Sequence, residues 1–329
     1  VKTNNITNQK QSGRCWMFST LNVLRQRVIA KCDLEDFSFS PTYLAFYDKL
    51  EKANLFLENI LHFADQDLTD RETYTLLGNP LPDGGQWDMF ANIVRKYGVV
   101  PKDVYDETYQ SSNTRSMNAQ LNRALKVAAA GLRRMAADKA GADAIQAEKN
   151  KTLDAIYGFL CSCYGVPPKA FDFEFVDKDQ VYHIEKNLTP LTFAERYVGD
   201  LLDQVVSVIN APTADKPYHK TYTIRLLGNV VEGRPVVHLN LTMDELKAAI
   251  IAQLKAGKVV WFGSDVGHFG ERTLGVWDDR SFDFAALTGL SLAMDKADAL
   301  DYGLAAMNHA MVLTGVNLDE AGKPTRWKI

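Results

Sequence analysis

Cys15 stands where a short polar stretch, residues 8–14, meets a run with helical spacing. The run predicts a helix, because its apolar residues recur at intervals close to one turn: Phe18, Leu21, Leu24, Val28 and Ile29. A thiol at a helix N-terminus faces unpaired backbone N–H groups and the positive end of the helix dipole, which favour the thiolate. Because the thiolate is the reactive form, this position predicts that Cys15 is a nucleophile.

A cysteine nucleophile also needs a base and donors for the oxyanion. Gln9 lies six residues before Cys15, across a Ser-Gly turn that could return its amide N–H to the sulfur. Six histidines could supply the base, and their distance from Cys15 in the sequence does not decide between them: His62, His183, His219, His238, His268 and His309. His309 differs from the others because it begins an apolar strand, where a strand end can present its ring to a cleft.

The elements that must position these residues are helical in the first half of the chain and mostly strands in the last quarter. Helices are expected at 15–31, from Pro41 to about 61 with Ser40 as N-cap, at 87–97, within 113–160, near 190–204, from the Thr242 capping box to Ala256 with Gly257 as C-cap, and near 296–303. Strands are expected at 171–176, 222–227, 236–241, 259–263, 309–316 and 325–329, with a Gly/Pro-rich loop at 78–86 and largely irregular structure at 264–308. This order indicates an α+β fold.

Composition excludes several classes of protein. The 329 residues carry a net charge of −4, so nothing draws the whole chain to nucleic acid or anionic membranes. No apolar run has the length of a membrane span, and the N-terminus has no signal-peptide core. Four cysteines in this length do not make a disulfide scaffold, so we expect a reducing, cytoplasmic compartment.

Three segments, in chain order, carry a family resemblance. Residues 9–16 (QKQSGRCW) resemble the nucleophile segment of the papain superfamily of cysteine peptidases, and residues 83–87 (DGGQW) resemble its double-glycine loop. Residues 308–310 (NHA), followed by an apolar strand, resemble its histidine segment. The cysteine-to-histidine gap is 309 − 15 = 294 residues, against about 130–150 in papain-like enzymes.

That longer gap resembles one branch, the bleomycin hydrolase and aminopeptidase C group, which carries a large helical insertion. Residues 37–44, 97–102 and 260–267 also resemble this branch. The resemblance implies a papain-like two-lobed fold: a helical lobe at 1–105, a mostly helical insertion at 106–235 and a β-barrel-like lobe at 236–329.

The chain departs from secreted papain-like enzymes in an informative way. Ser12 and Pro82 stand where those enzymes have the two cysteines of a disulfide, which agrees with a cytoplasmic protein. Arg14 precedes the nucleophile, as in the branch. The family's orienting Asn and C-terminal arm are expected beyond Ile329, and the branch's N-terminal extension is missing too. We therefore expect this chain to be a fragment of a longer protein.

The resemblance implies a role for each matching residue. Cys15 is the nucleophile, and His309 takes its proton and then protonates the leaving amine. The Gln9 side chain and the Cys15 N–H form the oxyanion hole, while Gly84, Gly85 and Asn308 bind the peptide. The implied activity is a cysteine aminopeptidase that needs no metal or organic cofactor, acts on peptides and assembles as a homohexamer.

Other interpretations stay open. An inactive papain-like scaffold or binding protein is the first, and an acyltransferase that uses the same two residues is the second. The Cys161-Ser162-Cys163 run lacks a second pair of metal ligands, so we expect a structural role. A basic run on one predicted helix is followed by acidic residues, so a solvated face is favoured over nucleic-acid contact: Arg123, Lys126, Arg133, Arg134 and Lys139.

Overall fold

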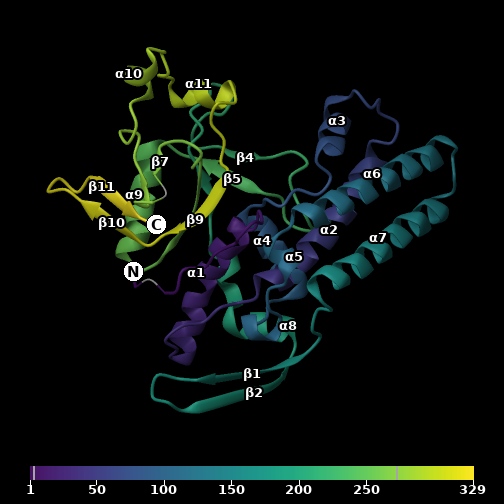
Figure 1. The fold of residues 1–329 in the computed structure, drawn as a ribbon, viewed down its shortest axis with the longest axis horizontal. Coiled ribbons are helices and arrows are strands. Elements are labelled where there is room, and N and C mark those ends of the chain that lie inside the picture. The colour runs from purple at the N-terminus through teal and green to yellow at the C-terminus, as the bar shows by residue number, and fades with distance from the viewer. Residues whose placement is uncertain (3, 272) are drawn as a thin grey trace. The chain divides into compact units, whose positions relative to one another are not determined.

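The computed structural model describes residues 1–2, 4–271 and 273–329, and it divides them into two compact units (Figure 1). The larger unit comprises residues 4–205 and 224–236, and the smaller unit comprises residues 1–3, 206–223 and 237–329. The predicted α+β class is confirmed, because helices dominate the larger unit and most short strands lie in the smaller one. The three-part division at 105 and 235 remains a prediction.

The larger unit is built on a long central helix, α2. Its helices are α1 (Cys15–Cys32), α2 (Pro41–His62), α3 (Arg71–Gly78), α4 (Trp87–Tyr97), α5 (Tyr109–Ser112), α6 (Arg115–Ala137), α7 (Ala142–Tyr164) and α8 (Pro190–Tyr197), with 3₁₀ turns η1 (Lys102–Val104) and η2 (Gly199–Asp203). Helix α2 packs against α1, α4, α6 and α7, so both of its long sides are covered. A hairpin of β1 (Phe171–Val176) and β2 (Tyr182–Leu188) completes the unit.

Local sequence signals explain how α2 begins. Ser40 Oγ accepts a hydrogen bond from the Tyr43 N–H at 3.1 Å, and Pro41 occupies the first helical turn, as predicted. The helix is apolar enough to be buried along most of its length, yet it also buries Asp48, Lys49 and Lys52. Charged side chains are rarely buried unless they are paired. Asp48 pairs with Lys52 within the helix, and Lys49 pairs with Asp83.

The smaller unit is made of short, separate sheets. Its strands are β3 (Val208–Ile209), β4 (Thr221–Thr223), β5 (Val237–Asn240), β6 (Val260–Ser264), β7 (Gly270–Glu271), β8 (Val276–Trp277), β9 (His309–Leu313), β10 (Gly315–Leu318) and β11 (Pro324–Lys328), and its helices are α9 (Met243–Lys255), α10 (Phe284–Thr288) and α11 (Lys296–Asp301). The order β3-β5-β4 forms one sheet, while β6-β9, β7-β8 and β10-β11 form pairs.

Several expectations about this unit were wrong in detail. The predicted strand at 309–316 is interrupted at Thr314 and forms two strands. The first, β9, pairs with β6, and the second, β10, pairs with β11. The Thr314 N–H donates to the carbonyl of Lys328 in β11 at 2.8 Å. Backbone pairing therefore changes from β6 to β11 at this residue. The segment 264–308 was predicted to be largely irregular, but it also contains β7, β8 and α10.

Candidate functional site

Cys15 is the first residue of α1, as its sequence position predicted. It is a half-buried free thiol, and the other three cysteines are free as well. Burial raises the pKa of the Cys32 and Cys163 thiols, which makes them poorer nucleophiles at neutral pH. Cys15 is therefore a more accessible thiol than Cys32 or Cys163, and it lies at a helix N-terminus.

Two hydrogen-bond donors near Cys15 have no acceptor within the described residues. One is the Cys15 backbone N–H, which belongs to the first turn of α1 and so has no intrahelical partner. The other is Gln9 Nε2, whose companion atom Oε1 is buried without a partner. The Gln9 carbonyl is held by Ser12 Oγ at 2.6 Å, which closes the turn between the two residues. Both donors proposed for the oxyanion hole are thus uncommitted in the larger unit.

Arg14 fixes the backbone immediately before the nucleophile. It is 2% exposed, and its guanidinium forms two parallel hydrogen bonds to Glu107, at 3.0 and 2.8 Å, and a third to Ser12 Oγ. Burial alone would raise the pKa of Glu107, but Arg14 and the hydroxyl of Ser111 outweigh it and lower that pKa. The paired charges therefore lock the turn that leads into α1.

The double-glycine loop lies against residues on both sides of Cys15. A Cβ at Gly13 would overlap the Cβ of Asp83, and a Cβ at Gly85 would lie 2.7 Å from the indole of Trp16. Trp16 also donates from Nε1 to the Asp83 carbonyl at 2.8 Å. The structure therefore brings the predicted loop and the nucleophile segment together within one unit.

This close approach makes a stability prediction for Gly85. Replacing Gly85 with alanine is expected to lower the free energy of unfolding by about 1–3 kcal/mol, because the new methyl group overpacks the Trp16 indole. Gly84→Ala is the matched control, since its Cβ would meet open space and could raise stability by up to about 1 kcal/mol. Urea unfolding of both variants measures the difference, and equal midpoints would contradict the packing described here.

His309 begins β9 and pairs with Ser264 of β6 in the smaller unit. The neighbouring Asn308 side chain is engaged at both ends: its Oδ1 accepts from the Val266 N–H at 3.0 Å, and its Nδ2 donates to Asp265 at 2.7 Å. Asn308 therefore connects the start of β9 to residues 265–266. The contact of Asn308 with substrate stays a prediction.

Asp265 gathers the segments that flank the histidine. Besides Asn308, its carboxylate accepts from the backbone N–H groups of Gly267 at 2.9 Å and Ala306 at 3.2 Å. Burial alone would raise the pKa of Asp265, but these three donors outweigh it and lower the pKa. Cys15 and His309 belong to different units, so the pairing of thiol and imidazole stays a prediction.

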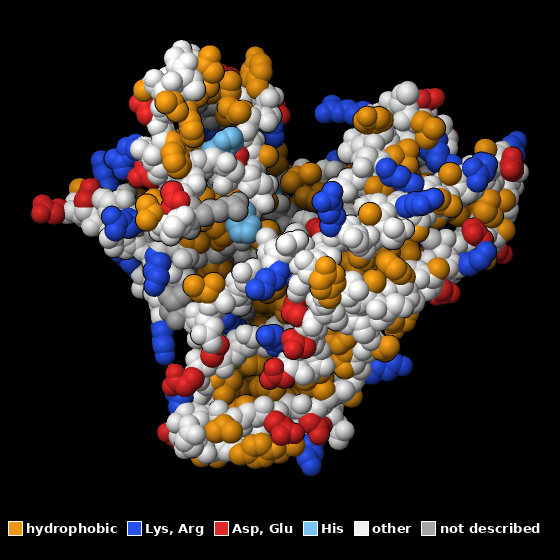
Figure 2. Space-filling model, viewed as in Figure 1, with side chains coloured by type: hydrophobic (Ala, Val, Ile, Leu, Met, Phe, Trp, Pro, Cys, Tyr) orange, Lys and Arg blue, Asp and Glu red, His pale blue; other side chains and the backbone are white. Residues whose placement is uncertain are grey.

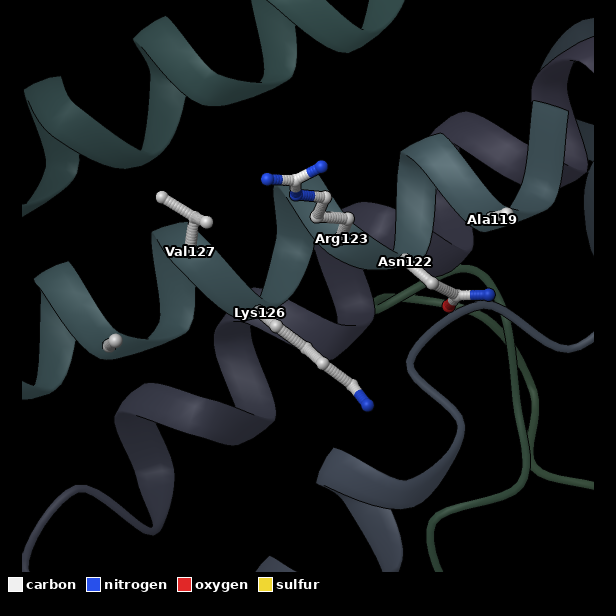
Figure 3. A pocket seen from close by; sticks show the side chains of 6 residues that line it. Ala119, Asn122, Arg123, Lys126 and Val127 are labelled. Carbon is white, nitrogen blue, oxygen red and sulfur yellow. The ribbon is translucent and has the colours of Figure 1, made fainter. Parts of the chain in front are cut away.

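A pocket elsewhere on the larger unit carries none of these residues. It lies on α6 and is lined by Ala119, Asn122, Arg123, Lys126, Val127 and Ala130. Figure 3 shows the Arg123 and Lys126 side chains extending from the helix in different directions, and both are exposed. Charges that do not converge fit the solvated helix face expected from the sequence.

Comparisons with known proteins decide the family. The sequence profile of the peptidase C1-like family matches residues 1–329. The chain belongs to the peptidase C1-like family. It is 50% identical over 324 residues to aminopeptidase C of Streptococcus thermophilus, covering 98% of this chain and 73% of that protein. It is 47% identical over 329 residues to aminopeptidase C of Lactobacillus delbrueckii subsp. lactis, covering 100% and 73%.

A solved structure agrees with these relatives. The crystal structure of pepw from Lactobacillus rhamnosis HN001 superposes with a TM-score of 0.97 and 51% identity, covering 99% of this chain and 73% of that one. The predicted papain-like fold and the predicted function, a cysteine aminopeptidase, are confirmed. None of these relatives supports the alternative of an inactive scaffold.

The sequence did not reveal the charged residues that support the site. Asp48, Lys49 and Lys52 share a helix whose pattern fits a solvent-exposed polar face equally well, and Glu107 lies far along the chain from Cys15 outside the segments that carry the family resemblance. Asp265 lies within one of those segments, residues 260–267, but no role was assigned to it. Only the spacing of Asp48 and Lys52, one helical turn apart, hinted at an ion pair.

Proposed function

We propose that this protein removes residues from the free N-termini of peptides, with Cys15 as nucleophile and His309 as its base. The Cys15 thiolate attacks the peptide carbonyl, and the imidazolium of His309 protonates the leaving amine. Water, deprotonated by His309, then releases the acyl group from Cys15. The Cys15 N–H and Gln9 Nε2 stabilise the oxyanion in both steps; one such donor typically contributes about 10²–10³ in rate.

The observation that carries this proposal is the free, half-buried thiol of Cys15 on the first turn of α1, where the backbone N–H of Cys15 has no intrahelical partner. The bare backbone of Gly84 and Gly85 supports peptide binding, because an extended substrate can pair with it as a short added strand. The aminopeptidase C relatives support action at N-termini. The four free thiols support a reducing, cytoplasmic location. Among the described residues, no helix combines the length and apolarity that crossing a membrane requires.

Thiol labelling tests the proposed nucleophile. We expect iodoacetamide to modify Cys15 before Cys32 and Cys163, because both of these are buried, and before Cys161, which lies within a helix rather than at a helix N-terminus. Peptide mass mapping locates the adduct while hydrolysis of an aminoacyl-coumarin is followed in the same sample. Loss of activity should track the modification of Cys15. Labelling spread over Cys32, Cys161 and Cys163, without hydrolysis, would support an inactive relative instead.

We further propose that the protein assembles as a homohexamer, as the branch resemblance implies. The segment 282–294 of the smaller unit exposes a series of large apolar side chains, which is typical of interaction surfaces: Phe282, Phe284, Leu287, Leu290, Leu292 and Met294. Figure 2 shows apolar side chains gathered over the end of this unit that carries α10.

The oligomer is checked by measuring molar mass in solution. Sedimentation equilibrium is expected to give six times the mass of one chain, and a monomer would contradict the proposal. Leu287→Lys, at 81% exposed, is expected to weaken assembly. Val127→Lys on α6, at 67% exposed, is the matched control and should leave the mass unchanged.

A further inference from the structure

Three successive carbonyls of the double-glycine loop are held by buried side chains. Lys52 Nζ donates to the carbonyls of Pro82 at 2.9 Å and Gly84 at 2.8 Å, and Trp16 Nε1 donates to the carbonyl between them. Lys52 is 3% exposed and projects from the interior of α2. Lysine is almost never this deeply buried without a partner, so the loop carbonyls account for its position.

The ammonium of Lys52 also forms an ion pair. Its Nζ lies 2.8 Å from Asp48 Oδ2, one turn earlier on α2, where Asp48 is 1% exposed. Asp48 Oδ1 in turn accepts from Asn229 Nδ2 at 3.0 Å. Two hydrogen bonds and one ion pair therefore hold the ammonium of Lys52. The loop is therefore attached to the central helix by a neutralised, buried pair.

A second buried pair holds the same loop through its one acidic side chain. The Asp83 carboxylate accepts from Lys49 Nζ, from Thr114 Oγ1 at 2.9 Å and from Asn118 Nδ2 at 2.8 Å. Burial alone would raise the pKa of Asp83, but Lys49 and the two other donors outweigh it and lower the pKa to about 2. Asp83 is therefore ionised at neutral pH and bridges α2 to α6.

We propose that Lys52 and the Asp83–Lys49 pair are positioning residues for the substrate strand, holding Gly84 and Gly85 against the residues that flank Cys15. This inference rests on the proposed role of Gly84 and Gly85 in binding peptide.

The test compares Lys52 with a buried lysine that does not touch the loop. Lys52→Met keeps the length of the side chain and removes its charge, and a second substitution, Asp48→Asn, prevents an unpaired buried carboxylate. Lys149→Met is the control, since Lys149 is 4% exposed and pairs with Glu58 on the same helix α2. All variants are assayed on an extended peptide with a free N-terminus, and the released N-terminal residue is quantified by mass spectrometry.

The double variant is expected to lower kcat/KM by about 10- to 100-fold. The change should come from a rise in KM, because a displaced loop binds the extended substrate less well. The rate of Cys15 alkylation should stay unchanged, which separates a loop defect from a damaged nucleophile. An unchanged KM, or an equal rise in KM for Lys149→Met, would overturn the proposal. Wild-type protein that neither hydrolyses the substrate nor labels at Cys15 would instead refute the proposed function.

A milder variant covers the case in which the double variant does not fold. Thr114→Val preserves the shape of a residue that is 3% exposed and removes only one donor from Asp83. Its KM is expected to rise about threefold, because Asp83 loses one hydrogen bond to a charged group. The effect is small because Lys49 and Asn118 still hold the carboxylate. A folded Thr114→Val protein with wild-type KM would also overturn the proposal.

Discussion

Replacing Cys15 with alanine is expected to reduce hydrolysis of aminoacyl-coumarins by about 10⁶-fold, to the level of the background. Without the sulfur no acyl-enzyme forms, and the two oxyanion donors alone cannot replace a covalent step. The fold should survive, because Cys15 is half-buried on the first turn of α1 and forms no disulfide. Steady-state kinetics and the unfolding midpoint of the same preparation measure both effects.

Cys161→Ala is the matched control, because Cys161 is also a half-buried cysteine in a helix of the larger unit. We expect it to keep wild-type turnover and to keep iodoacetamide labelling at Cys15. Hydrolysis that persists in the Cys15 variant, or that disappears in the Cys161 variant, would mean that another group is the nucleophile.

Replacing His309 with alanine is expected to reduce turnover by at least about 10⁴-fold. Two losses combine, since the variant lacks both the cation that stabilises the thiolate and the acid that protonates the leaving amine. Alkylation of Cys15 by iodoacetamide at pH 6 should also slow, because less of the sulfur is then ionised. This second measurement separates a chemical role from a loss of structure at the start of β9.

His183→Ala is the control for the histidine. His183 lies on β2 of the larger unit, where its Nε2 is 2.7 Å from Asp177 Oδ2 at a partly exposed position. Turnover and the pH dependence of alkylation should match the wild type in that variant. If His309→Ala keeps its turnover, or if alkylation of Cys15 at pH 6 is unchanged, His309 is not the base.

Much of the helical framework could be predicted from local signals. The start of α2 was predicted from Ser40 and Pro41, and α9 begins at the capping box formed by Thr242 and Glu245. Helix α4 occupies the predicted residues 87–97, and Gly98 follows it with a φ of +77°. These features depend on neighbours within a turn or two, so the residues that decide them are adjacent in the sequence.

Strand pairing was less predictable. The apolar run after His309 reads as one strand, but Thr314 separates a segment that pairs with β6 from one that pairs with β11. The C-cap of α9 is Ala256, where Gly257 had been predicted. Gly257 follows it with a φ of +75°. A strand is defined by its partner, and the partner is chosen by contacts far along the chain.

The sequence alone determined the family and predicted the reactive residues. Cys15, Gln9, the glycines at 84 and 85 and His309 stand in motifs whose order and spacing are specific, and nucleophilic chemistry needs those side chains wherever the chain folds. Only the tertiary structure decided what holds them. Lys52 and Glu107 are ordinary charged residues in the sequence, and their contacts depend on burial and on partners in other elements, which no local pattern records. Asp83 stands in the double-glycine motif, but its pairing with Lys49 is visible only in the fold.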